Sequence, residues 1–304
     1  MSVVTSATTG QPCVVLSHLS GATAEVQLHG ATVTSYKTPK GDCVLFVSSE
    51  AIFNGAKAIR GGIPLVFPQF GQPDKAMPSH GVARTAAWAL GEEYPPPEGR
   101  VSVNLHLLES EDTLSKFPHK FKLRYEVALG ADSLATTLHI TNPGSAAFDF
   151  QASSAASTTL QHTYLAIPDV AALQITGFQG VSFVDQLDGG AVKMDERGEA
   201  TIAEEVDRIY SGDIPDVGVS GGAGGMGVTV GKSCVKSLPG DEAEAVKVDT
   251  VFWNPWIDKA KRVGDFGDEE YKKMVCVEPG LVSKFHRILP QQTYSFTQTL
   301  TPSA

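Results

Sequence analysis

Residues 121–129 have the sequence FKLRYEVAL, in which every second side chain, beginning with the first, is apolar. Residues 101–107 (VSVNLHL) show the same two-residue period, and residues 134–140 (LATTLHI) and 294–300 (YSFTQTL) repeat it more loosely. This period is typical of a strand that buries one face. Turn residues such as the Asn-Pro-Gly at 142–144 separate these runs. The pattern predicts an all-β fold of antiparallel strands.

Helical patterns are few, and no strand–helix–strand repeat predicts a parallel sheet. Only residues 258–262 and 268–273 are typical of short helical turns. Residues 94–99 (YPPPEG) and 220–227 (SGGAGGMG) are flanked on both sides by strand-like sequence, so we interpret them as hairpin or surface loops, not domain linkers. Single β-sandwich domains often reach about 200–250 residues. We therefore predict one large β-sandwich domain over residues 1–304.

Charge and composition narrow the classes of function. The chain has 24 Lys and Arg against 34 Asp and Glu, a net charge of −10, which opposes binding to nucleic acid or anionic membranes by bulk charge. No apolar run approaches the roughly 18 residues of a membrane span, and residues 1–20 lack the pattern of a signal peptide. We expect a soluble cytoplasmic protein with scattered, buried free thiols at its four cysteines, Cys13, Cys43, Cys234 and Cys276.

Two glycine-rich motifs resemble nucleotide-binding loops. Residues 222–227 (GAGGMG) match G-x-G-x-x-G, and residues 231–233 (GKS) resemble the end of a P-loop, although Met226 stands where that loop needs glycine. Both motifs bind phosphate only when a helix follows, and the next residues favour β structure. We interpret both as plain glycine-rich turns. The acidic residues 240–249 (GDEAEAVKVD) are expected to form a solvated loop.

Residues 58–88 combine two arginines with glycines and prolines. Arg60 precedes a Gly-Gly pair, and Arg84 ends the segment SHGVAR. Permissive glycine and stiff proline are usual in loops that present side chains to a ligand. Two guanidinium groups would hold a phosphate through forked hydrogen bonds. From spacing alone, two unrelated surface or ion-paired arginines remain the alternative.

Six segments together carry a resemblance to a known family. In chain order they are RGGIPLVFPQFG (60–71), HGVAR (80–84), QHTYL (161–165), VDRIY (206–210), FWNPWIDKAKRVGDFGDEEY (252–271) and VCVEPG (275–280). The chain resembles the hexose-6-phosphate mutarotase branch of the aldose 1-epimerase family. The resemblance implies a galactose-mutarotase-like β-supersandwich, a sugar-phosphate substrate, and acid–base catalysis without a cofactor.

The resemblance implies a catalytic pair formed by His162 and Glu278. On the sequence alone, His162 is either a structural histidine or a proton donor, and its ordinary pKa of about 6.5 suits donation near neutral pH. Glu278 ends an apolar run before Pro279, so it is either a surface residue at a strand end or a carboxylate in a cleft. In the implied mechanism, ionised Glu278 takes the proton of the C1 hydroxyl and protonated His162 donates to the ring oxygen.

The resemblance also implies substrate-binding roles for residues of the arginine-bearing loops. Arg60 and Arg84 would grip the 6-phosphate, and Ser79 and His80 would line the pocket beside them. Some relatives carry a longer amide side chain in place of Ser79, so its contact is not implied as firmly.

Asp207 would accept hydrogen bonds from sugar hydroxyls, and an ion pair with Arg208 is an equal alternative. We interpret Trp253 and Trp256 as core aromatic residues of the sandwich. The eight histidines and four cysteines show no metal-ligand spacing, so we expect no metal.

The sequence thus predicts an isomerase that interconverts the anomers of a hexose 6-phosphate, with no cofactor and no partner except the sugar phosphate, acting as a monomer. Two alternatives stay open. One is a non-catalytic β-sandwich that binds carbohydrate or phosphosugar, and the other is a mutarotase for neutral aldoses.

Overall fold

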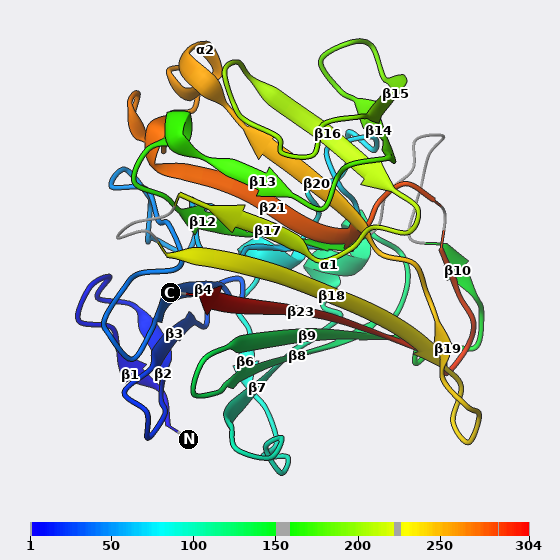
Figure 1. The fold of residues 1–304 in the computed structure, drawn as a ribbon. Helices are drawn as coiled ribbons and strands as arrows, with labels where there is room; N and C mark the ends of the chain where they lie inside the picture. Colours follow the sequence, from blue (N-terminus) through cyan, green and yellow to red (C-terminus); the bar gives the residue numbers. More distant parts are fainter. Residues whose placement is uncertain (1, 150–158, 222–225, 285, 304) are drawn as a thin grey trace.

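Antiparallel strands make up most of the chain in the computed structural model, which describes residues 2–149, 159–221, 226–284 and 286–303. Two large sheets lie one above the other, and a smaller N-terminal sheet stands beside them (Figure 1). The predicted all-β fold is therefore confirmed.

The first large sheet, which we name the β9 sheet, contains all four of the strands predicted from alternation. Its order is β13 (Gln174–Thr176), β17 (Val217–Ser220), β18 (Gly227–Ser237), β23 (Thr293–Ser303), β9 (Leu134–Thr141), β8 (Lys122–Leu129), β7 (Val101–Leu108) and β6 (Ala89–Leu90), with β19 (Glu244–Ala245) on β18.

The second large sheet, which we name the β21 sheet, is assembled from strands distant in sequence. Its order is β15 (Ala191–Asp195), β14 (Val181–Asp185), β16 (Val206–Ser211), β20 (Asp249–Asn254), β21 (Met274–Leu281), β11 (Thr159–Gln161) and β5 (Leu65–Val66), and β12 (Tyr164–Ala166) also pairs with β21.

Smaller elements complete the fold. The N-terminal sheet is β1 (Val4–Thr5), β2 (Pro12–Ser17), β3 (Thr23–Gln27) and β4 (Val33–Lys37), and β10 (Phe148–Asp149) pairs with β22 (Arg287–Ile288). The helices are short: α1 (Glu111–Lys116), α2 (Trp256–Ala260) and the 3₁₀ turns η1 (Ala83–Thr85), η2 (Val170–Ala172) and η4 (Glu270–Lys273). Within the described residues, no helix is long and apolar enough to cross a bilayer.

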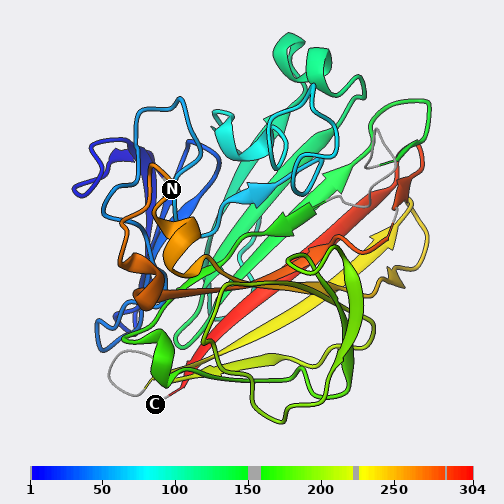
Figure 2. The same cartoon turned by 90° about the horizontal axis from the view of Figure 1, so that it is seen from above.

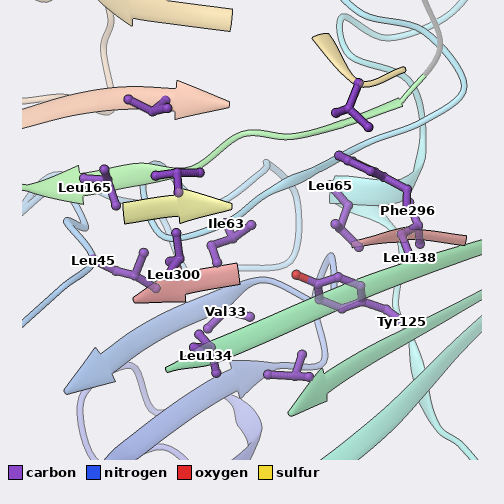
Figure 3. Packing of buried hydrophobic residues seen from close by; sticks show 14 of the residues in the cluster. Val33, Leu45, Ile63, Leu65, Tyr125, Leu134, Leu138, Leu165, Phe296 and Leu300 are labelled. Carbon is purple, nitrogen blue, oxygen red and sulfur yellow. The ribbon is translucent and has the colours of Figure 1, made fainter. Parts of the chain in front are cut away.

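The alternation that predicted the strands is also the pattern of their burial. Along β9, every second residue from Leu134 is buried, and β23 alternates in the same way. The buried side chains meet those of the N-terminal strands and of the loops before β5; Val33, Ile63, Leu138 and Phe296 lie together in the core (Figure 3). Burying each such side chain stabilises the fold by about 1.5–3 kcal/mol.

The loops agree with most of the predictions. β6 pairs with β7 across residues 94–99, and β17 pairs with β18 across residues 220–227. Both segments therefore join the two strands of a hairpin, as predicted. Residues 231–233 lie within β18, which confirms that no P-loop forms there. Of the GAGGMG motif, residues 222–225 lie outside the described residues, and a strand follows it.

Some expectations were wrong or incomplete. Helix α1 was not predicted, because six residues are too few for a helical period; its start is set by Ser110, whose side chain accepts from the Thr113 N–H. The segment 240–249 is not wholly solvated, since buried Asp249 accepts hydrogen bonds from the main chain at Ser283. All four cysteines are free, and three are buried as expected, but the expectation was wrong for Cys43, which is exposed.

Gly62, in the arginine-bearing loop, should tolerate no side chain. Its φ is +67°, and a Cβ would overlap the carbonyl oxygen of Val33. Gly41 has a φ of +91° but nothing within 4 Å of a Cβ, so Gly41→Ala isolates the cost of the backbone conformation. We expect Gly41→Ala to lower the free energy of unfolding by about 1–2 kcal/mol and Gly62→Ala by at least about 3 kcal/mol, measured by urea denaturation. Equal losses would contradict the close packing at Gly62.

Candidate active site

The pairing of β11 and β12 with β21 brings His162 and Glu278 together. Both short strands pair with β21 in one common register, and His162 and Thr163 lie between them. Continued across this interruption, the register places His162 directly opposite Glu278. The main chain at the interruption is still bonded, because the His162 N–H donates to Pro64 O at 3.0 Å and the Val277 N–H donates to Thr163 O at 3.3 Å.

Glu278 and His162 point away from the β9 sheet. Successive side chains of a strand point to opposite faces, and Val277 belongs to the core between the large sheets. Cys276 and Tyr164 therefore share a face with Glu278, and they pack in a separate apolar cluster with residues of α2 and η4. The pair thus lies on the outer face of the β21 sheet, beneath the segment that contains α2.

The two catalytic candidates form a buried contact. His162 Nδ1 lies 3.1 Å from Glu278 Oε2, and their side chains are 9% and 1% exposed. The two atoms lack the alignment of a hydrogen bond, and neither has a hydrogen-bond partner elsewhere in the described residues. Buried polar atoms are nearly always satisfied, so an unsatisfied pair points to a site for a ligand.

Burial also disfavours the charged form of both groups. It lowers the pKa of His162 well below 6.5, and the nearby cations Arg84 and Arg60 act in the same direction. It raises the pKa of Glu278 well above 4.5; Asp207 adds to this shift and Arg84 opposes it. The protein's own groups therefore favour a neutral imidazole beside a protonated carboxyl.

Aromatic rings enclose His162. The Tyr164 ring is stacked on the imidazole, with centroids 4.6 Å apart and planes 13° apart, and the His80 ring lies 5.7 Å away. Trp253 meets His162 edge-on at 5.8 Å. The interpretation of Trp253 as only a core residue was therefore incomplete, because its half-buried ring also borders the site; Trp256 packs against the apolar cluster below α2, as expected.

Both predicted arginines are held in place by other residues. Arg60 Nε donates to Asp265 Oδ1 at 3.0 Å, and its Nη1 donates to the hydroxyl oxygen of Tyr164 at 3.2 Å. Arg84 Nη2 donates to the main-chain oxygen of Ser79 at 2.7 Å, whereas its buried Nε has no partner among the described residues. Arg60 is thus ion-paired, as one form of the alternative expected, and the phosphate-binding roles of the two arginines stay predictions.

A pocket of about 420 Å³ lies between the two arginines, which line it together with Ser79, Thr85 and Asp265. Burial lowers the pKa of Arg84 to about 10, while Tyr164 and Asp265 keep the pKa of Arg60 above its ordinary value. Both side chains are therefore cationic at neutral pH. The pocket suits an anion.

Asp207 lies on β16, opposite Trp253 of β20. Its carboxylate is 3.5 Å from Lys259 Nζ, and the same Nζ lies 3.0 Å from Glu205. Arg208 instead approaches Asp195. The alternative of an ion pair between Asp207 and Arg208 is therefore wrong, because adjacent strand residues point to opposite faces.

One cluster among the described residues offers donor atoms for a metal: His162, Cys276 and Glu278 each have a ligand atom within 4.8 Å of the others. The chemistry fits a cation poorly. Burial and the neighbouring Glu278 raise the pKa of the Cys276 thiol, and a protonated thiol is a weak ligand. Positive charge from Arg84 and Arg60 also reaches His162.

The structure brings most of the predicted residues into one region. His162 and Glu278 are in contact, and Arg60 reaches the same region through Tyr164. Ser79 contributes a main-chain oxygen to Arg84, so the short side chain at this position does not affect that contact.

Sequence reasoning missed three polar residues of the site. Tyr164 joins Arg60 to His162, Asp265 orients Arg60, and Lys259 pairs with Asp207. All three lie inside segments that carried the family resemblance, but their hydrogen-bond and ion-pair partners Arg60 and Asp207 are far away in sequence. Only the segments themselves could have signalled them.

Comparisons with known proteins agree with this architecture. A relative from Cenchrus ciliaris is 36% identical over 279 residues, covering 89% of this chain and 78% of that protein. One from Escherichia coli (strain K12) is 26% identical over 278 residues, covering 91% and 86%. Both bear the name "Putative glucose-6-phosphate 1-epimerase".

Solved structures show the same fold. A "putative mutarotase" from Salmonella typhimurium superposes with a TM-score of 0.81 at 24% identity, covering 100% of this chain and 97% of that one. A galactose mutarotase related enzyme from Lactobacillus acidophilus gives a TM-score of 0.69 at 13% identity, covering 96% and 97%. The family model for aldose 1-epimerase matches residues 12–301. The chain therefore belongs to the aldose 1-epimerase family and is an isomerase with a galactose-mutarotase-like fold.

Proposed function

We propose that this enzyme is a hexose-6-phosphate 1-epimerase that interconverts the α and β anomers of glucose 6-phosphate. The observation that carries the proposal is the buried, unsatisfied pair of His162 and Glu278, which Tyr164 connects to Arg60 in the wall of a pocket between two arginines. Family membership supplies the reaction, and the names of the relatives support the phosphorylated substrate.

In the proposed reaction, Glu278 removes the proton of the C1 hydroxyl, and the electron pair of that O–H bond forms the carbonyl of the open aldehyde. The C1–O5 bond breaks, and its electron pair goes to O5, which takes a proton from His162. Rotation about C1–C2 then presents the other face of the carbonyl. The reverse proton transfers close the ring with the opposite configuration. Because O1 and O5 are bonded to the same carbon, an acid and a base in contact can serve both oxygens.

The other residues would bind the substrate. Arg60 and Arg84 hold the 6-phosphate, with Ser79 and His80 beside them, and Asp207 accepts hydrogen bonds from sugar hydroxyls. Lys259 supports this role, because its charge opposes the effect of burial, which raises the pKa of Asp207. The ionised carboxylate is the better acceptor.

The proposed proton positions differ from those that the protein's own groups favour. Catalysis requires a protonated His162 and an ionised Glu278, whereas burial favours the neutral pair. The two arrangements contain the same number of protons and differ only in whether one of them is on the Glu278 carboxyl or on the His162 imidazole. A phosphate dianion beside Arg60 and Arg84 would offset the positive charge that opposes protonation of His162.

We also propose that the chain acts as one domain and as a monomer in the cytoplasm, on a small molecule and not on nucleic acid or a membrane. One apolar core joins the two large sheets, which supports a single domain. The three buried free thiols suit a reducing compartment.

Removing either catalytic group should abolish most of the activity. We expect His162→Asn and Glu278→Gln each to slow anomer exchange of glucose 6-phosphate by about 10²–10⁴-fold, measured by NMR saturation transfer. His18→Asn, on the surface, serves as the matched control and should exchange at the wild-type rate. Wild-type rates in both site variants would refute the mechanism; no exchange by the wild-type enzyme would refute the function.

A charge-preserving change at Arg84 should weaken phosphate binding. Arg84→Lys keeps one positive charge but loses the fork, so we expect KM for glucose 6-phosphate to rise about tenfold or more. The control, Arg197→Lys, changes an arginine that pairs with Asp195 instead. An unchanged KM in Arg84→Lys, or equal rates with glucose and glucose 6-phosphate, would point to a mutarotase for neutral aldoses.

Glu278 should also make the fold less stable as the pH rises. Its carboxyl keeps a proton in the native state at pH values where the unfolded chain has lost it, so this contribution to stability falls as the pH rises above about 4.5. Glu278→Gln removes the effect. We expect the difference in free energy of unfolding, Glu278→Gln minus wild type, to increase by up to about 1.4 kcal/mol per pH unit between pH 5.5 and 8.5.

Urea denaturation at several pH values measures this gain. Glu242→Gln changes an exposed glutamate and should show no such trend. A constant difference between Glu278→Gln and the wild type across the range would show that the native carboxyl is ionised throughout.

A further inference from the structure

The two parts of the site are joined by direct contacts. Arg60 Nη1 donates to the Tyr164 hydroxyl at 3.2 Å, and the Tyr164 ring is stacked on His162 with centroids 4.6 Å apart. Tyr164 is 1% exposed, so its ring has little freedom to move independently. An anion that binds Arg60 therefore acts on a residue that is bonded to Tyr164, the side chain in contact with the imidazole of His162.

The arginine pocket also has unused capacity to donate hydrogen bonds. Arg84 Nε is buried and has no partner among the described residues, and its Nη2 donates only to the Ser79 main chain. Arg60 has a second Nη group besides the one that meets Tyr164. An oxyanion between the two guanidinium groups would satisfy these donors.

The charges around His162 respond to such an anion. The titratable groups that face it are His80 from the loop before η1, Arg84 of η1, Arg60, Tyr164 of β12, and Glu278 and Cys276 of β21. Arg84 and Arg60 both oppose a positive charge on the imidazole, and Arg84 also favours the ionised form of Glu278. Neutralising both arginines therefore favours protonation of His162.

We propose that an oxyanion held between Arg60 and Arg84 activates His162, and that Tyr164 is the positioning residue that connects the anion to the acid. This inference deepens the proposed function and depends on it. The phosphate of the substrate is then an activator of the reaction as well as a handle for binding.

The proposal predicts that the substrate can be supplied in two pieces. Xylose has the pyranose ring of glucose without C6, and inorganic phosphite supplies the missing dianion. We expect phosphite to accelerate enzymatic anomer exchange of xylose at least tenfold, in a saturable manner, as measured by NMR saturation transfer. Exchange in the same phosphite solutions without enzyme must be subtracted, because anions catalyse ring opening in water.

The positioning role is tested with Tyr164→Phe, which keeps the stacked ring but loses the oxygen that accepts from Arg60. We expect the acceleration by phosphite, taken as a ratio within each variant, to fall at least fivefold. Tyr210→Phe is the matched control, since Tyr210 is an equally buried tyrosine of the β21 sheet whose hydroxyl donates to Asp195. Its ratio should equal that of the wild type.

The outcomes separate the two proposals. If the wild type exchanges glucose 6-phosphate but phosphite fails to accelerate xylose, or slows it, the activation is refuted and the proposed function stands. If glucose 6-phosphate itself is not exchanged, the proposed function fails first. Undiminished acceleration in Tyr164→Phe would refute the connection through Tyr164.

Discussion

The register between β21 and the interrupted pair β11 and β12 is the constraint on which the site depends. It sets His162 across from Glu278, although 116 residues separate them in the chain. A shift of one residue between the strands would turn one of the two side chains to the opposite face of the sheet and separate the pair. The interruption remains bonded, through the main chain at Pro64 and Val277, so the site is irregular but not loose. In Figure 2, the orange helix α2 lies beside the blue N-terminal segments. Between these parts of the chain, Arg60 Nε donates to Asp265 Oδ1.

The burial of His162 against Glu278 costs electrostatic free energy, which favourable burial elsewhere in the fold offsets. Two titratable groups are buried in contact, and two cationic arginines lie close by, so the protein alone favours the uncharged pair. The large apolar core between the sheets offsets such a local cost, since single buried side chains each contribute about 1.5–3 kcal/mol. Shifted pKa values of this kind are typical of active sites.

Local patterns predicted the strands well because burial alternates along each of them, as in β8, β9 and β23. The β21 sheet was harder to predict, since its central strand Met274–Leu281 is buried at every residue and has no alternation. The catalytic and phosphate-binding candidates came from the family resemblance and not from periodicity. Contacts such as Asp207 with Lys259 depend on the path of α2 over the sheet, which no local pattern describes.

The net charge of −10 places little constraint on the anion pocket. At an ionic strength of about 0.1 M, charges more than roughly 10 Å apart are largely screened, so distant carboxylates hardly affect a bound phosphate. The local balance decides instead: Arg60 is partly offset by Asp265, while the charge of Arg84 has no carboxylate partner among the described ion pairs. In the proposed complex, forked hydrogen bonds from the half-buried Arg84 would determine affinity, because a partly desolvated guanidinium gains from an anion that replaces its lost water.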